Sequence, residues 1–99
     1  MARAIINGNS SPVAVVADVA SKRLVITSLF LVVTTAVTVT FEDTDGADIS
    51  GAMALGANGS LVLPHNPDGW FETPVGKGLK IALGTGVQIS GYMNYHFRD

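Results

Sequence analysis

The sequence contains no cysteine and few charged residues. Its 99 residues include six Lys or Arg and eight Asp or Glu, a charged fraction of 14%, whereas about 25% is ordinary for a globular domain. Without cysteine, no disulfide supplements the core. A chain of this length buries only about two-thirds of the surface that it exposes when unfolded. We therefore expect it to bury part of its surface against copies of itself or a partner.

The usual signals for catalysis and for nucleic-acid binding are also missing. There is no cysteine nucleophile, no Gly-x-Ser-x-Gly elbow and no glycine-rich phosphate loop before a helix. The net charge of −2 and the pI of about 5.5 argue against a nucleic-acid partner. No apolar segment with a cleavage site follows the N-terminus, so no secretory signal is predicted. We expect a protein that is not an enzyme and has no cofactor and no bound metal.

The longest uncharged segment, residues 24–41, has the strongest pattern in the chain. It is rich in Val, Ile, Leu, Phe and Thr, and charged residues border it on both sides. One interpretation is a transmembrane helix, which needs about 20 mostly apolar residues. The other is two strands joined by a turn at residues 34–35. Strict apolar–polar alternation over residues 37–42 and the many β-branched side chains favour two strands and no membrane span.

The rest of the chain repeats the strand pattern between turn signals. Residues 1–11 are mostly small and polar and are predicted to form a flexible N-terminal arm, with residues 12–99 as a single domain. Asn58-Gly59 and the segment 84–86 are each predicted to close a tight hairpin, and Asp45-Gly46 is a third hairpin signal. No segment has helical spacing of apolar residues. The predicted fold is all-β: an antiparallel β-sandwich, jelly-roll-like, with seven or eight strands.

Alternation also predicts which side chains are buried. The strand at residues 24–33 is apolar on both faces, so each face needs a cover. Gly91 interrupts the last strand and marks a bulge or a close approach of two backbones. The predicted core is Leu24, Ile26, Phe30, Val39, Phe41, Leu61, Leu63, Leu79, Ile81, Leu83 and Ile89.

From Leu24 onward, a series of features follows a recognisable order. A long apolar strand within RLVITSLFLVV precedes an alternating strand, AVTVTFE. A turn with Gly and Asn leads into LVLP, and then come NPDGWFET, GLKIALG and VQISGYMNYHF. In this order the chain resembles the head decoration, or cement, proteins of tailed bacteriophages.

The resemblance implies a structural protein of the virion. It implies a jelly-roll-like sandwich, assembly into a homotrimer, and binding to the major capsid protein without catalysis. The expected location is the capsid surface of the virion, after synthesis in the host cytoplasm. The first 20 residues lie outside the resemblance, so it assigns no role to them.

Two groups of residues are candidates for an interface. Adjacent strand residues point to opposite faces, so one of the two aromatic residues 70 and 71 is predicted in the core and the other at an interface. Alternate residues of the last strand share an outward face whose Tyr, His and Arg suit the polar part of an interface. The interface candidates are Trp70, Phe71, Tyr92, Asn94, His96 and Arg98.

Other functions remain open on the sequence. Trp70 shares a loop with Asn66, Asp68 and Glu72, which is consistent with a carbohydrate-binding module. Asp68 and Glu72 also resemble the carboxylate pair of a glycosidase, but a turn aspartate and a strand-edge glutamate are commoner.

Two patterns are weighed as metal sites. Three aspartates at residues 43, 45 and 48 suit calcium, although their spacing is not that of an EF-hand, and the favoured interpretation is a solvated hairpin tip. His65 and His96 lack a third ligand for zinc.

Overall fold

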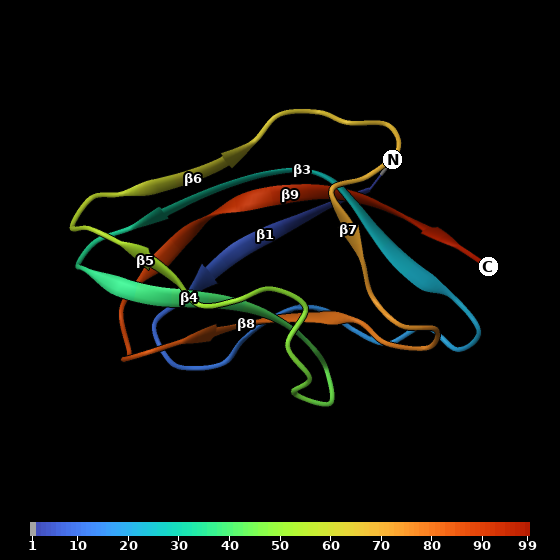
Figure 1. Cartoon of the computed structure of the whole chain (residues 1–99), viewed down its shortest axis with the longest axis horizontal. Coiled ribbons are helices and arrows are strands. Elements are labelled where there is room, and N and C mark those ends of the chain that lie inside the picture. The colour runs from blue at the N-terminus through green and yellow to red at the C-terminus, as the bar shows by residue number, and fades with distance from the viewer. Residues whose placement is uncertain (1) are drawn as a thin grey trace.

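Residues 24–41 form two strands, as predicted. In the computed structural model, which describes residues 2–99, they belong to β3 (Arg23–Val33) and β4 (Val37–Asp43) (Figure 1). All regular structure in this part of the chain is β-strand. Within residues 2–99 there is accordingly no apolar helix of membrane-spanning length.

The strands of the described chain form two antiparallel sheets. The remaining strands are β1 (Ala2–Gly8), β2 (Val13–Val16), β5 (Met53–Leu55), β6 (Ser60–Leu63), β7 (Phe71–Glu72), β8 (Leu79–Leu83) and β9 (Ile89–Arg98). The five-stranded sheet has the order β1-β9-β3-β6, with the short β7 also pairing with β3. The four-stranded sheet has the order β2-β8-β4-β5. These nine strands compare with seven or eight predicted.

The strand order and the connections between the two sheets are those of a jelly roll. Apart from β7, the chain changes sheet at every connection except the one from β4 to β5. As a result β1 lies beside β9 in one sheet, and β2 lies beside β8 in the other. Two four-stranded sheets connected in this way form the jelly-roll sandwich. The predicted fold class is confirmed.

Two of the predicted hairpins are wrong. The turn at residues 56–59 joins β5 to β6, and residues 84–86 lead from β8 towards β9, but both pairs of strands lie in opposite sheets. Asn58 has the expected positive φ of 58°, and Gly59 N donates to Gly56 O at 2.8 Å. Turn residues therefore predict where the chain reverses, but not whether the strands on either side pair. The third signal, at Asp45-Gly46, lies in the connection between β4 and β5, which do pair.

The flexible arm predicted for residues 1–11 is also wrong, because residues 2–8 form β1. This strand pairs with β9 over its whole length, from Ala2 opposite Tyr95 to Gly8 opposite Ile89. Ile6 is 1% exposed and belongs to the core. Ala4 is partly buried against the same core, whereas Arg3, Ile5 and Asn7 are exposed on the other face. Met1 lies outside the described residues.

The core between the sheets contains most of the predicted side chains. Leu24, Ile26, Val39, Phe41, Leu79, Ile81, Leu83 and Ile89 are buried, and Leu61 and Leu63 are partly buried against them. Phe30 was predicted in the core, but it is 39% exposed on the outside of the sheet.

A break in the register of β3 explains the error at Phe30. Along β3, Ile26 is opposite Tyr95 and Ser28 is opposite Asn94, so Thr27 is an extra residue between them. One extra residue in a strand reverses the alternation that follows it. Leu24 and Ile26 therefore face the core before Thr27, and Leu29, Leu31 and Val33 do so after it.

Candidate functional site

Four apolar side chains form a line across the outside of the five-stranded sheet. Ile5 is opposite Tyr92, Tyr92 is opposite Phe30, and Phe30 is opposite Val62. They are 69%, 37%, 39% and 57% exposed in the order Ile5, Tyr92, Phe30, Val62. Directly opposite side chains lie within contact range, so the line is continuous across four strands. We name these four residues the apolar row.

Aromatic contacts fix the middle of the apolar row. The rings of Phe30 and Tyr92 are 6.2 Å apart between centroids, and the Arg3 guanidinium lies 4.7 Å above the Tyr92 ring. Gly91 allows the two strands to approach closely, because a Cβ there would lie 1.8 Å from the Phe30 carbonyl oxygen. With a φ of +154°, Gly91 is also in a conformation that favours glycine. The close approach predicted at this position is confirmed.

Polar side chains border the apolar row on the Arg3 side. Arg3 Nε donates to Asn94 Oδ1 at 3.3 Å, and Asn94 Nδ2 donates to Ser28 Oγ at 2.8 Å. On the other side of the apolar row, the next line of residues on the same face is Asn7, Ser90, Val32 and Ser60, of which Val32 alone is apolar. An apolar centre with a polar margin and an aromatic–Arg contact is typical of a protein–protein interface.

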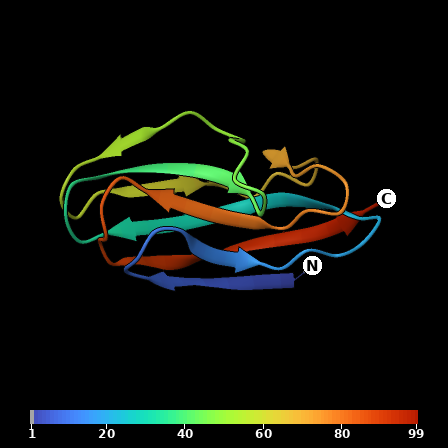
Figure 2. The same ribbon diagram turned by 90° about the horizontal axis from the view of Figure 1, so that it is seen from below.

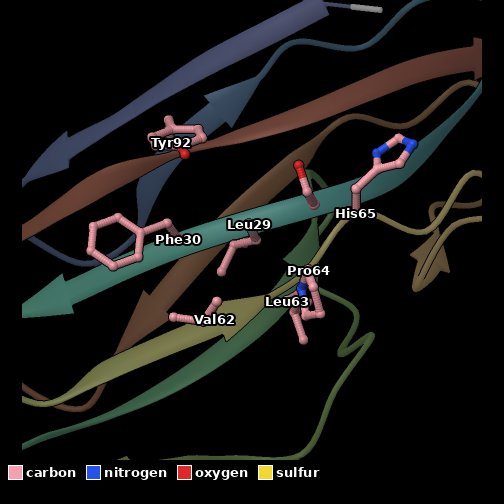
Figure 3. Close-up of a pocket in the computed structure, with 8 residues that line it drawn as sticks. Leu29, Phe30, Val62, Leu63, Pro64, His65 and Tyr92 are labelled. Carbon is pink, nitrogen blue, oxygen red and sulfur yellow. The ribbon is translucent and has the colours of Figure 1, made fainter.

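A shallow pocket opens beside the apolar row (Figure 3). Its volume is about 320 Å³, at the low end of the range for small-molecule sites. It lies between β3 and β6 and is lined by Ser28, Leu29, Phe30, Val62, Leu63, Pro64, His65 and Tyr92. Because three of these residues belong to the apolar row, the row and the pocket form one surface.

Of the two neighbouring aromatic residues, Phe71 packs against the core and Trp70 is exposed; the interface predicted for one of them stays a prediction. The Phe71 ring lies 5.1 Å from the Phe41 ring and packs against the core. Trp70 is 44% exposed, and its Nε1 donates to Pro64 O at 2.7 Å.

The loop before Trp70 covers one end of β3. A Cβ at Gly69 would lie 2.4 Å from a Val25 methyl, so this loop passes directly over Val25. Val25 is 3% exposed as a result. The outer face of β3, the strand that is apolar on both faces, is therefore covered at Val25 but exposed at Phe30.

The other interface candidates on β9, Asn94, His96 and Arg98, do not form one cluster. Asn94 bonds to Arg3 and Ser28, and His96 is half-buried opposite Val25. Arg98 Nε lies 3.2 Å from a carboxylate oxygen of Glu72 at the far end of the sheet. Only Tyr92 of this group belongs to the apolar row.

Three residues of the apolar row were missed by reasoning from the sequence. Phe30 was placed in the core because the extra residue Thr27 was not foreseen, and Ile5 was placed in a flexible arm. Val62 alternates with Leu61 and Leu63, which does indicate an outward side chain. The adjacent apolar residues Ile5 and Ile6, within a segment of mostly small and polar residues, are the sequence feature that indicates a strand at the N-terminus.

In the acidic turn, residues 43–48, the carboxylates of Asp43 and Asp45 have separate partners. Asp43 is 4% exposed, and its Oδ1 accepts the N–H groups of Asp45 and Ala47 at 2.9 and 3.0 Å. Asp45 Oδ2 lies 2.7 Å from Lys77 Nζ, and this contact raises the pKa of Lys77. Within residues 2–99, no three potential metal ligands come together.

Comparisons with family models, with curated proteins and with solved structures find no match to this chain. A function is therefore proposed from the fold, the surface and the sequence features described above.

Proposed function

We propose that this protein is a structural, non-catalytic protein of a bacteriophage virion, which assembles as a homotrimer and binds the major capsid protein as a cement or decoration protein. The apolar row is the observation that supports assembly. It exposes large apolar side chains from four adjacent strands on one face. Contiguous exposed apolar patches mark interaction sites, whereas single exposed apolar residues need no explanation.

Copies of the same chain are the proposed occupants of this surface. A chain with 14% charged residues and no disulfide gains stability when subunits cover each other's apolar surface. In a closed cyclic trimer every subunit contributes the same surfaces, so no apolar row is left uncovered.

The virion setting rests on the order of sequence features, which resembles that of capsid decoration proteins. The jelly-roll fold supports it, because viral capsid proteins are among the main users of this fold. Lectins also use it, so the fold alone does not choose between the virion role and the carbohydrate-binding alternative.

Sedimentation of matched variants tests the trimer. We expect the wild-type protein to sediment as a trimer at micromolar concentration. Tyr92→Asp places a charge in the apolar row and should give a monomer that melts earlier, because assembly and folding are linked. Thr38→Asp is the control, since Thr38 is exposed on the four-stranded sheet, and it should remain a trimer. A monomeric wild type, or a trimeric Tyr92→Asp variant, would contradict the proposal.

The capsid partner is tested with the genes that adjoin this one. A major capsid protein encoded there, assembled into shells, should co-sediment with the wild-type protein and not with Tyr92→Asp. Shells that bind neither protein would remove the virion role and leave the trimer intact.

The carbohydrate-binding alternative has less support in the structure. In its loop, Asn66 Oδ1 accepts the N–H of Asp68 at 3.1 Å, and Asn66 Nδ2 donates to Gly69 O at 3.3 Å. Glu72 lies near both Arg23 and Arg98. These polar groups serve the fold itself, which leaves the exposed Trp70 ring as the main feature for a sugar. A monomer that binds immobilised polysaccharide would favour this alternative.

A further inference from the structure

The edge of the five-stranded sheet at β1 is long and unprotected. β1 lies outermost in its sheet, and among the described residues only β9 pairs with it (Figure 2). In an edge strand, every second residue directs its N–H and C=O groups away from the sheet. Natural edge strands are usually shortened, bulged, or interrupted by Pro or charged side chains, especially Lys, to prevent pairing with other chains. The seven residues of β1 have no Pro and no register break, and their one charged side chain, Arg3, contacts Asn94 and Tyr92 of the neighbouring β9.

The other edges of the sandwich have the protection that β1 lacks. β5 has three residues, and β7 has two. β6 has four residues, and Pro64 follows it immediately. β2 also has four residues, and its register is broken between Ala14 and Val16. The contrast indicates that β1 is kept free for a partner strand.

We propose that the partner strand is β1 of a second copy, paired antiparallel about a twofold axis at Ile5. Ile5 is the central residue of β1, so this register pairs all seven residues. It sets Ile5 opposite Ile5, Arg3 opposite Asn7, and Ala4 opposite Ile6. Arg3, Ile5 and Asn7 stay together on the outer face, as continuous sheet pairing requires.

Chemistry at the matched positions favours this register over its neighbours. Arg3 faces the amide of Asn7, whose oxygen accepts from Gln88 Nε2 at 2.7 Å and has a second lone pair for the guanidinium. The two Arg3 side chains lie on opposite sides of the axis. A register centred on Ala4 would set Arg3 opposite Ile5, and one centred on Ile6 would leave Arg3 without a partner in β1.

Pairing through β1 also extends the apolar row. Ile5 is the end of the row at the sheet edge, so the twofold axis joins the rows of both copies into one line. This contact uses the edge of the sheet, whereas the proposed trimer uses its face. Each trimer would then have three β1 edges with which to join neighbouring trimers. That linking role rests on the proposed function, and the pairing itself does not.

Single cysteines provide a direct test, because the natural chain has none. Directly opposite residues in an antiparallel pair have Cα atoms about 4.5–5.5 Å apart, within the range for a disulfide. Under mild oxidation, Ile5→Cys should form a covalent dimer. Arg3→Cys and Asn7→Cys should each stay uncross-linked alone but cross-link when mixed. No dimer from Ile5→Cys, or equal cross-linking of Arg3→Cys with itself, would overturn the proposal.

Two further variants test this contact, and the second separates it from the trimer. Ile5→Lys sets two charges face to face at the axis and should abolish edge pairing, with an unchanged circular dichroism spectrum; because Ile5 also belongs to the apolar row, this variant should weaken the trimer as well. If Ile5→Lys still pairs through the β1 edge as strongly as the wild-type protein does, the proposal is contradicted. Phe30→Asp should disrupt the trimer, and Ile5→Cys added to it should still cross-link. A covalent dimer from a protein that never forms trimers would reject the proposed trimer and retain the pairing of β1.

Discussion

The two sheets enclose the same core but present different outer faces. Large exposed apolar side chains occur on the outer face of four strands of the five-stranded sheet, at Ile5, Phe30, Val62 and Tyr92. Among the described residues, none occurs on β2, β4, β5 or β8. The outer face of the four-stranded sheet instead carries Ala14, Thr38, Thr40, Glu42, Ala54, Lys80 and Ala82. One sheet thus has the surface of a solvated protein, and the other has apolar side chains beyond those that the core uses.

The difference arises in the arrangement of single strands. In β4 the alternation is unbroken, so Val37, Val39 and Phe41 fill the core and Thr38 and Thr40 face outward. In β3 the extra residue at Thr27 reverses the alternation. Thr27 is itself buried, and its Oγ1 donates to Asn94 O at 3.1 Å. Without the extra residue, Leu29, Leu31 and Val33 would face outward; with it, they fill the core and the sheet exposes Phe30 beside Tyr92.

The largest expected effect comes from comparing two phenylalanines, one on each sheet. Phe41 is 3% exposed beneath the four-stranded sheet, and Phe41→Ala should cost about 3–5 kcal/mol of unfolding free energy. Phe30 is 39% exposed, and Phe30→Ala should cost the monomer about 1–2 kcal/mol. Urea unfolding at concentrations where the protein is monomeric measures both. Equal losses would mean that the reversal of alternation in β3 is wrong.

For residues 24–41 the sequence predicted the two strands correctly, but not the extra residue at Thr27. Residues 24–26 and 29–33 are all apolar, so either face of the strand could have been the inner one. Only pairing with β9 selects the register, and it does so through the extra residue Thr27 in β3. In β4, where Thr alternates with Val and Phe, the sequence alone predicted the inner face correctly.

The candidate site was predictable in part for a related reason. Tyr92 was placed on an outward face because β9 alternates regularly. Ile5 was missed because its strand depends on a long-range pairing with β9, which short-range propensity does not show. Turn signals at Asn58-Gly59 located a reversal of the chain, but the crossing between sheets is a property of the whole jelly roll.

The second prediction concerns the connection between β4 and β5 in the four-stranded sheet. Asp43 is buried, and its carboxylate accepts two backbone N–H groups. Asp43→Ala leaves these donors unpaired and should cost about 1–3 kcal/mol of unfolding free energy. Asp43→Asn retains an acceptor oxygen and should lose less. The surface pair of Asp45 and Lys77 is the control, since Asp45→Asn should change the unfolding free energy little. Equal losses in urea unfolding for Asp43→Ala and Asp45→Asn would contradict this prediction.

The third prediction, with a smaller effect, concerns acid. Asp18 lies between β2 and β3, where its Oδ1 accepts from Thr44 Oγ1 and from Gly78 N, the latter at 2.6 Å. These bonds, the Thr44 bond foremost, hold the pKa of Asp18 below its ordinary value of 3.8. Both are bonds to the charged carboxylate, and they tie the loop to the ends of the four-stranded sheet.

The sign of the pH effect follows from this shift. A lowered pKa in the folded state gives stability that is complete above the unfolded pKa and is lost as pH falls through the folded pKa. Asp18→Asn should therefore have a lower melting temperature than wild type at neutral pH, and the two should converge as pH falls from about 5 to about 2. Other carboxylates titrate equally in both proteins and cancel in the difference. A gap that stays constant down to the lowest pH would contradict the role of Asp18.

The smallest expected effect is that of calcium on the acidic turn, where no shift is predicted. The Asp43 carboxylate is already bonded to the backbone, and Asp45 is paired with Lys77, so neither is free to bind a cation without losing a contact. A ligand that binds only the folded state raises its melting temperature. Adding calcium, and then a chelator, should leave the melting temperature of the wild type unchanged. A rise that calcium produces in the wild type, and that Asp43→Asn abolishes, would show a metal site at this turn and make the four-stranded sheet a second functional face.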